Sequence, residues 1–172
     1  IAMALFGDLR FDYRVFREAT SLQQAGHKVS IVCSTFHAGP ITGWDNFDIY
    51  PIPVDRNLSL RLLYPTFWRQ ARQHLSSINV DAYHAHDLDT LLPAARAARQ
   101  RDVPLIYDSH ELWTEQSSLE KRPFIRFFWQ EMEKRLITRV HRTISVSPSI
   151  AQILQKRYCL DHEVVLLRNL PL

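Results

Sequence analysis

Residues 105–115 read LIYDSHELWTE, and residues 83–89 read YHAHDLD. Each stretch begins with a short apolar run typical of a β-strand and continues into His, Asp, Ser and Glu residues where a strand would end. In open α/β sheets, ligands bind in the crevice outside the carboxyl ends of the strands. We therefore expect both polar stretches to lie at one edge of a sheet, where they would meet a ligand.

Strand-like and helix-like segments alternate along the rest of the chain. Apolar runs predict strands at residues 1–6, 29–33, 49–54, 80–85, 105–107, 143–146 and 164–167. Helical periodicity predicts helices at residues 12–26, 59–75, 90–101 and 122–138, and another from 148. This alternation predicts an α/β fold, with a Rossmann-like, doubly wound, mostly parallel sheet and helices on both faces.

Helix ends and faces can also be predicted. In the first helix, Val15 and Ala19 fall on the apolar face, and Arg14 and Glu18 fall on the opposite face. Thr90 is expected to cap the third helix and to place Pro93 at its third position. Ser147 and Pro148 have the residue types favoured at a helix start.

Two other helices have predicted core stripes. We expect the helix at 59–75 to pack through Leu62, Leu63, Phe67, Trp68 and Ala71. We expect the helix at 122–138 to pack through Ile125, Phe128, Trp129, Met132 and Leu136. Pro51 and Pro53 place the strand at 49–54 at an edge of the sheet, because proline cannot donate to the sheet ladder.

Composition excludes several classes of protein. The 172 residues suit one domain, and 21 basic against 18 acidic residues give a net charge of +3 without a nucleic-acid-binding tail. Cys33 and Cys159 lie far apart without metal-ligand spacing, which favours a reducing compartment and a cytoplasmic location. No apolar run approaches the roughly 20 residues of a membrane span.

The loop after the first strand, FGDLRFDYR, contains only Gly7. A dinucleotide-binding fingerprint needs glycines for the tight turn, for the approach of the phosphates and for helix packing, and the chain has no Walker lysine motif either. Independent binding of NAD or ATP is therefore disfavoured.

A metal-dependent hydrolase is one alternative. His84 and His86 are two positions apart on a strand and project to one side, and Asp108 and His110 would complete a metal site. Asp87 would then point away from both histidines, which argues against this hypothesis. The simpler interpretation is that one histidine packs under a helix while the other lines a cleft.

His110 is the sharper candidate. It follows a buried strand, lies between Ser109 and Glu111, and would face His86 and Asp87 if the two strands are neighbours. Such a cluster can position a sugar hydroxyl and stabilise a developing positive charge. The alternative is that His110 only caps the segment that follows it.

The helix within residues 121–141 has a second unusual feature. It carries Phe124 and Phe127 beside Lys121, Arg122 and Arg126, a combination that suits the surface of an anionic membrane. The alternative is that the aromatic rings pack against neighbouring helices.

Several segments together resemble a known family. They are DYRVFREATSLQQAGHKVSIVC (12–33), DAYHAHDLDTLLPAARAARQRDVPLIYDSHELWTE (81–115), RTISVSPSIAQIL (142–154) and VVLLRNLPL (164–172). In this order they resemble the amino-terminal half of family 4 glycosyltransferases of the GT-B fold, with the weakest match at residues 36–75. The resemblance implies two Rossmann-like domains facing each other across a cleft. It also implies sugar transfer with retention of configuration, without a metal or any cofactor beyond the nucleotide-sugar donor.

Site residues follow from the same resemblance. His110 corresponds to the family histidine that approaches the transferred sugar, and is the expected catalytic residue. The expected substrate-binding residues lie in the loops at the cleft: Gly7, Asp8, Arg14, His86, Asp87, Ser109, Glu111 and Ser147.

The resemblance also predicts domain organisation and partners. Residues 1–168 would be the acceptor-side domain and 169–172 the start of an interdomain linker. The donor-binding domain would be absent, because no two of the seven glutamates have the family's spacing of eight. We expect half of an enzyme, which is inactive alone. The whole enzyme would transfer a sugar from a nucleotide-sugar to a carbohydrate or lipid-linked acceptor. We also expect peripheral contact with a membrane and no binding of nucleic acid. Another alternative is a non-catalytic carbohydrate-binding module.

Overall fold

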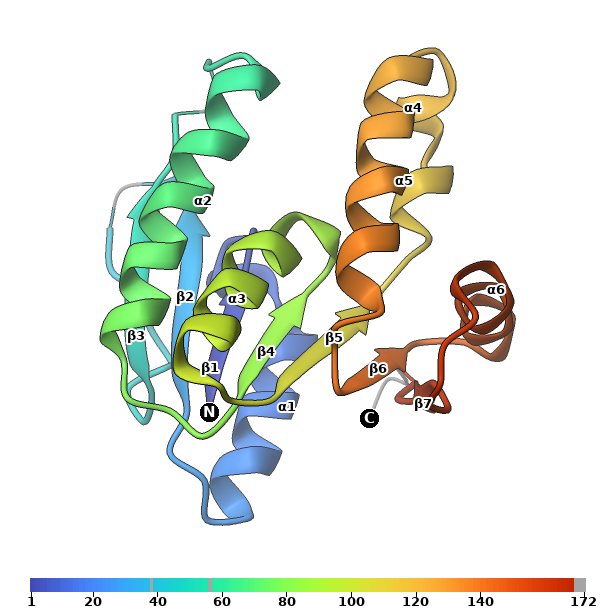
Figure 1. Ribbon diagram of the computed structural model, residues 1–172. Coiled ribbons are helices and arrows are strands. Elements are labelled where there is room, and N and C mark those ends of the chain that lie inside the picture. Colours follow the sequence, from blue (N-terminus) through green and yellow to red (C-terminus); the bar gives the residue numbers. More distant parts are fainter. Residues whose placement is uncertain (38, 56, 169–172) are drawn as a thin grey trace.

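The computed structural model describes residues 1–37, 39–55 and 57–168. Its seven strands form one sheet in the order β3-β2-β1-β4-β5-β6-β7 (Figure 1). Every neighbouring pair is parallel. The predicted Rossmann-like α/β fold is confirmed, and the sheet is parallel throughout the described residues.

The strands are β1 (Ala2–Leu5), β2 (Ser30–Thr35), β3 (Asp48–Pro53), β4 (Tyr83–His86), β5 (Leu105–Ser109), β6 (Arg142–Ser145) and β7 (Val165–Leu166). The helices are α1 (Tyr13–Gln24), α2 (Leu60–Ser77), α3 (Leu88–Arg101), α4 (Ser117–Glu120), α5 (Pro123–Ile137) and α6 (Pro148–Tyr158), with short 3-10 helices η1 (Leu9–Phe11) and η2 (Trp113–Glu115). β3 lies at the edge of the sheet, as its two prolines predict.

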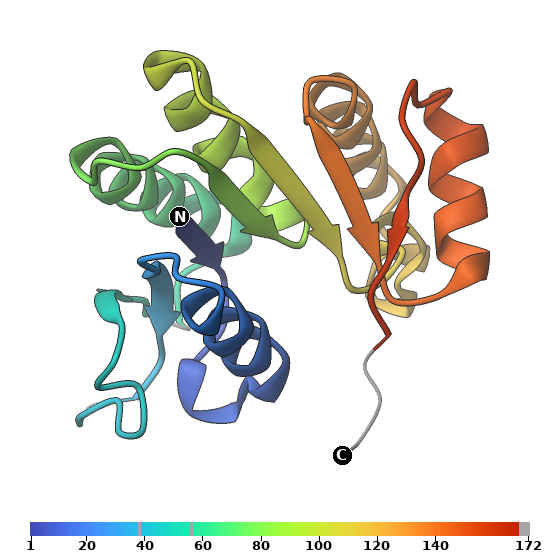
Figure 2. The ribbon, with the colours of Figure 1, turned by 90° about the horizontal axis from the view of Figure 1, so that it is seen from below.

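Two hydrophobic cores lie on opposite faces of the sheet. Figure 2 shows α1 on one side and α2 and α3 on the other. Because side chains alternate along a strand, Ala2 and Ala4 of β1 join the core under α2, α3, α5 and α6, and Met3 and Leu5 join the core under α1. Helices therefore cover both faces, as predicted.

A buried carboxyl group joins β5, α5 and α6 inside the larger core. The two oxygens of Glu133 accept hydrogen bonds from the hydroxyls of Tyr107 (3.0 Å) and Tyr158 (2.6 Å). Burial raises the pKa of Glu133, and these two hydrogen bonds partly oppose that rise. The contacts fix the position of β5, the strand that leads to His110.

Both faces of α1 contact the rest of the protein. Val15 and Ala19 are buried as expected, but Arg14 is also buried and Glu18 is largely buried. Both lie on the face opposite the apolar one, as predicted, but this face is buried rather than exposed. The polar face of α1 packs against polar side chains of β4 and β5, which are His84, His86 and Asp108.

The predicted start of α3 was also wrong. The helix begins at Leu88 with Asp87 as its N-cap residue, so that Pro93 lies inside the helix. Thr90 lies in the first turn, where its hydroxyl donates a hydrogen bond to the carbonyl of His86 (2.6 Å). The chain passes from β4 into α3 through Asp87 alone, which leaves no room for the loop that a cap at Thr90 would need. By contrast, Ser147 caps α6 as predicted.

Two residues of the predicted core stripes are exposed. Trp129 fills the space between α5 and the core, so Phe128 lies on the outer side of the helix. Leu62 is exposed near the start of α2, where Figure 1 shows the helix extending past the sheet. Among the described residues, no helix has the length and apolar character needed to cross a membrane.

Candidate functional site

The two polar stretches meet at the carboxyl ends of β4 and β5. These strands are neighbours, and His86 pairs in register with Asp108. Asp87 and His110 follow directly after this pair. The expectation that the stretches share one edge of the sheet is confirmed.

Two carboxylates hold the ring of His110 from opposite sides. Its Nδ1 lies 3.1 Å from Asp87 Oδ2, and its Nε2 lies 3.2 Å from Asp108 Oδ2. The backbone N–H of His110 also donates to Asp87 Oδ1 (3.0 Å), and His86 Nδ1 lies 3.3 Å from His110 Nε2. The orientation of the imidazole is therefore fixed.

Exposure separates this cluster into two layers. The side chains of His110 and Asp87 are 20% and 19% exposed, whereas those of Asp108 and His86 are 0% exposed. A substrate at this edge can therefore touch His110 and Asp87 directly. Asp108 and His86 are closed to it and contact His110 instead.

The two carboxylates also determine the charge of His110. Burial alone would lower the pKa of this imidazole, but the hydrogen bonds and charges of Asp108 and Asp87 outweigh burial and raise the pKa to about 10. Asp108 shows the complementary effect: burial opposes its ionisation, but His110, His86 and Arg14 lower its pKa. At neutral pH the pair is an imidazolium and a carboxylate.

Asp87 has a strained backbone. Its φ of 61° and ψ of 169° fall in a region that is almost restricted to glycine and that costs about 1–3 kcal/mol for other residues. Its N–H donates to the carbonyl of Asp108 (2.9 Å), which fixes the turn against β5. This strained conformation directs the Asp87 carboxylate to both the ring and the backbone of His110.

Arg14 connects α1 to the same cluster. Its guanidinium lies 2.7 Å from Asp108 Oδ2 and 3.0 Å from Glu18 Oε1, and it donates to the carbonyl of Leu167 (2.9 Å). The predicted site residue Arg14 therefore lies behind Asp108, where it supports His110 without contacting it.

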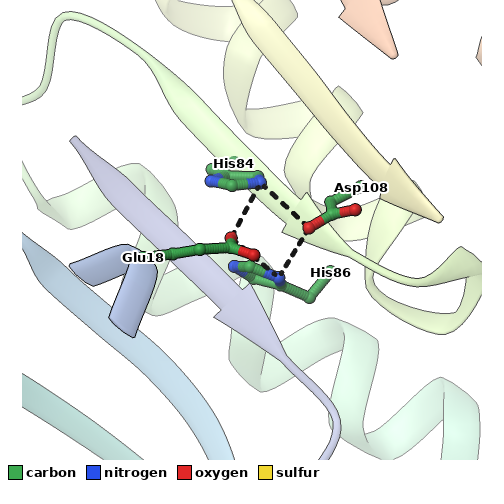
Figure 3. Close-up of side chains that lie close together, drawn as sticks. All are labelled: Glu18, His84, His86 and Asp108. Atoms are coloured by element: carbon green, nitrogen blue, oxygen red, sulfur yellow. Dashed lines mark ion pairs between the residues drawn. The ribbon is translucent and has the colours of Figure 1, made fainter. Parts of the chain in front are cut away.

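Glu18 was missed by sequence reasoning. It lies with His84, His86 and Asp108 in a compact group beneath α1 (Figure 3). The available signal was its place one helical turn after Arg14, which puts the two side chains on one face of α1. The hydrolase hypothesis grouped Asp108 and the two histidines with His110 instead.

Burial sets the protonation of this group. It raises the pKa of Glu18 to about 8, with a further contribution from the charge of Asp108. It lowers the pKa of His84 to about 4 and that of His86 well below the usual range. Both imidazoles are therefore neutral at physiological pH, and each keeps a ring nitrogen available as a ligand.

Asp8 belongs to a different polar cluster. Its carboxylate caps η1, lies 2.7 Å from Arg10 and lies 3.2 Å from His37. Gly7 precedes it without a left-handed backbone, and a Cβ there would meet the side chain of Leu5 at 3.4 Å. A role for this loop in binding phosphate or acceptor stays a prediction.

The other predicted residues have local partners. The Ser109 hydroxyl donates to the carbonyl of Glu111 (2.9 Å), and the Glu111 carboxylate accepts a hydrogen bond from Gln116. Ser147 accepts the N–H of Ile150 as the α6 cap. These hydrogen bonds stabilise a loop and the start of a helix. Substrate binding by the three residues stays a prediction.

Sheet order and site together define a class of protein. A parallel sheet of this order, with charged residues at the carboxyl ends of its central strands, is a Rossmann-like domain with a ligand-binding edge. The family model for Glycosyltransferase Family 4 matches residues 13–169, and the chain belongs to this family. No curated protein matches the chain.

Solved structures share the fold at low sequence identity. Sucrose-phosphate synthase from Thermosynechococcus elongatus has a TM-score of 0.70 and 14% identity, over 95% of this chain and 46% of that one. UDP-GlcNAc 2-epimerase from Methanocaldococcus jannaschii has a TM-score of 0.64 and 10% identity, over 96% and 44%. MurG from Acinetobacter baumannii has a TM-score of 0.55 and 18% identity, over 99% and 46%. The chain therefore spans less than half the length of each of these proteins.

The raised pKa of His110 predicts a pH-dependent stability. The pKa of an unfolded histidine is about 6.5, so between that pH and about 10 the folded chain binds more protons than the unfolded chain. The stabilisation is complete below about pH 6.5 and is lost as the pH rises through 10. We expect the free energy of unfolding to fall by a few kcal/mol more in the wild type than in His110→Gln over this range.

Urea unfolding at several pH values from 6.5 to 10 measures this difference. The exposed His27→Gln variant is the matched control and should follow the wild type. Parallel curves for the wild type and His110→Gln would contradict the assigned charge.

Proposed function

We propose that this domain forms the acceptor-side wall of a retaining glycosyltransferase. The enzyme would move a sugar from a nucleotide-sugar donor to a carbohydrate or lipid-linked acceptor. The observation that carries the proposal is the accessible His110–Asp87 pair at the carboxyl edge of the sheet, in a chain of Glycosyltransferase Family 4. Fold and family alone would leave the location of the chemistry open.

The chemistry follows from the charges at this edge. During transfer the sugar ring gains positive charge, and the leaving diphosphate gains negative charge. The Asp87 carboxylate places negative charge beside the sugar. The Nδ1–H of His110, which now contacts Asp87, can donate a hydrogen bond to a sugar hydroxyl instead. Prepositioned groups of this kind stabilise the transition state without reorganising during the reaction.

A second Rossmann-like domain would supply the donor contacts. The loop after β1 has one glycine and no Walker lysine, and the structural neighbours named above are about twice as long as this chain. We propose that the nucleotide-sugar binds mainly to that second domain and that transfer needs no other cofactor. The proposed linker at 169–172 lies outside the described residues.

The half-enzyme proposal predicts a loss of turnover in the isolated domain. We expect the domain alone to transfer sugar at least about a thousandfold more slowly than the same domain joined to a Family 4 donor-binding domain, because half of the charge stabilisation is missing. Release of nucleoside diphosphate from a panel of nucleotide-sugars measures the rate. A rate for the isolated domain near that of the two-domain protein would end this proposal.

A second prediction concerns His110 in the two-domain protein. We expect His110→Ala to lower kcat by more than tenfold, because it removes the positioned donor and leaves Asp87 without its partner. His27→Ala is the control, because His27 is exposed and lies outside the cluster. A kcat near that of the wild type would refute the catalytic role of His110.

The amino-terminal half of α5 supports a further part of the proposal. Phe124 and Phe127 are 88% and 62% exposed, and the basic residues Lys121 and Arg122 lie just before them. Figure 1 shows this end of α5 extending past the sheet on the side to which the strands point. We propose that it contacts an anionic membrane surface from the cytoplasm, which would place the site near a lipid-linked acceptor.

Vesicle sedimentation tests the membrane contact. We expect the domain to bind phosphatidylglycerol vesicles more strongly than phosphatidylcholine vesicles, and the double variant Phe124→Ser/Phe127→Ser to bind about tenfold more weakly, because it removes buried apolar area. The control is Ile153→Ser, which changes an exposed apolar residue on α6. Equal binding by all three proteins would rule out this surface.

A further inference from the structure

Four side chains from three elements converge beneath α1. Glu18 comes from α1, His84 and His86 from β4, and Asp108 from β5 (Figure 3). Each offers one ligand atom, and all four atoms lie within 4.8 Å of one another. This group lies behind the exposed His110–Asp87 pair and adjoins it, because His110 Nε2 lies 3.2 Å from Asp108 Oδ2 and 3.3 Å from His86 Nδ1.

The atoms are too far apart to satisfy one another. His84 Nε2 lies 3.9 Å from Glu18 Oε2 and 4.0 Å from Asp108 Oδ2. His86 Nδ1 lies 4.0 Å and 3.8 Å from the same two oxygens. These separations exceed hydrogen-bond length, yet they surround one common point.

Burial makes the arrangement costly. Oε2 of Glu18, Nε2 of His84 and Oδ1 of Asp108 are buried without a hydrogen-bond partner, whereas Oε1 of Glu18 contacts Arg14. His84 is 5% exposed, and Asp108 is completely buried. A buried polar group without a partner costs about 1–3 kcal/mol, so several together indicate that a species binding all of them belongs at the common point.

We propose that Glu18, His84, His86 and Asp108 form a binding site for a divalent cation, with zinc as the preferred ion. Two imidazoles and two carboxylates are a ligand set that zinc accepts in four-coordinate sites. Tetrahedral bonds of about 2.1 Å place ligand atoms about 3.4 Å apart. The four histidine–carboxylate separations given above therefore need to shorten by about half an ångström, and every other pair lies within 4.8 Å.

Arg14 is compatible with this site. It contacts Oε1 of Glu18, whereas Oε2 of the same carboxylate faces the histidines. On Asp108 it contacts Oδ2, the oxygen that also faces His84 and His86, whereas Oδ1 is without a hydrogen-bond partner. A carboxylate has about four acceptor positions, so each can bind a metal and Arg14 together. Arg14 then orients the two carboxylates from outside the coordination sphere.

The ion also has a route into the site. A cavity of about 400 Å³ borders the group on the side of α1, and Arg14, Glu18 and His84 line it. The sugar is proposed to bind at His110, on the exposed side of the cluster. The cation is therefore structural: it ties α1 to β4 and β5 behind the catalytic residue and takes no part in the transfer step.

Zinc binding to the untagged, chelator-treated protein tests the proposal. We expect one zinc ion per chain after dialysis against zinc chloride, measured by mass spectrometry of the metal, and a rise in the unfolding temperature with zinc. Glu18→Gln and His84→Gln should each weaken zinc binding by at least about a hundredfold in titration calorimetry. His27→Gln should bind like the wild type, because its exposed side chain lies outside the group.

Two results would overturn the proposal. Less than a tenth of an equivalent of zinc on the wild type would show that the four side chains do not form a zinc site. One equivalent retained equally by the wild type and by Glu18→Gln and His84→Gln variants with native circular dichroism would place the ion at surface histidines. Neither result depends on transferase activity, so the proposed function is tested separately.

Discussion

The carboxylate of Asp108 is the contact on which the site depends. It is completely buried, and its Oδ2 lies within 3.2 Å of both the guanidinium of Arg14 and the ring of His110. A buried charge is tolerated only when charged or hydrogen-bonded partners surround it, so β5, α1 and the loop after β5 must be placed together. Removing either partner would leave an unbalanced charge in the core. The position of His110 is therefore tied to the packing of α1 on the sheet.

This dependence gives the site two layers with different tasks. The outer layer, His110 and Asp87, is accessible and carries the charges that a substrate would meet. The inner layer, Asp108 with Arg14 and the group around Glu18, is closed to a substrate at that edge and fixes the outer layer in position. Polar groups held in this way need no rearrangement during a reaction, which is the main advantage of a site built on strand ends rather than on mobile loops.

Much of this architecture could be predicted from sequence, for a simple reason. Strands buried on both faces are continuous apolar runs, and polar residues that follow two neighbouring runs must meet at one edge, so His110 and Asp87 were found together. The inner layer could not be found in this way. Helical periodicity separates the polar face of α1 from its apolar face, but it does not show that the polar face meets buried histidines. Glu18 was therefore missed, and Arg14 was expected to meet a substrate rather than to lie behind Asp108. The prediction that Thr90 caps α3 was wrong for a similar reason, because the backbone turn at Asp87 depends on its contact with β5.

That turn narrows the choice of residue at position 87. Glycine would fit the backbone at φ 61° without strain but has no carboxylate for His110. Asparagine tolerates positive φ better than most residues but carries no charge, and glutamate carries the charge on a side chain that is one carbon longer. Aspartate alone combines a short side chain with a negative charge. Aspartate at this position therefore keeps its charged contact with His110 at the cost of backbone strain, which is the usual form of a trade-off between stability and activity.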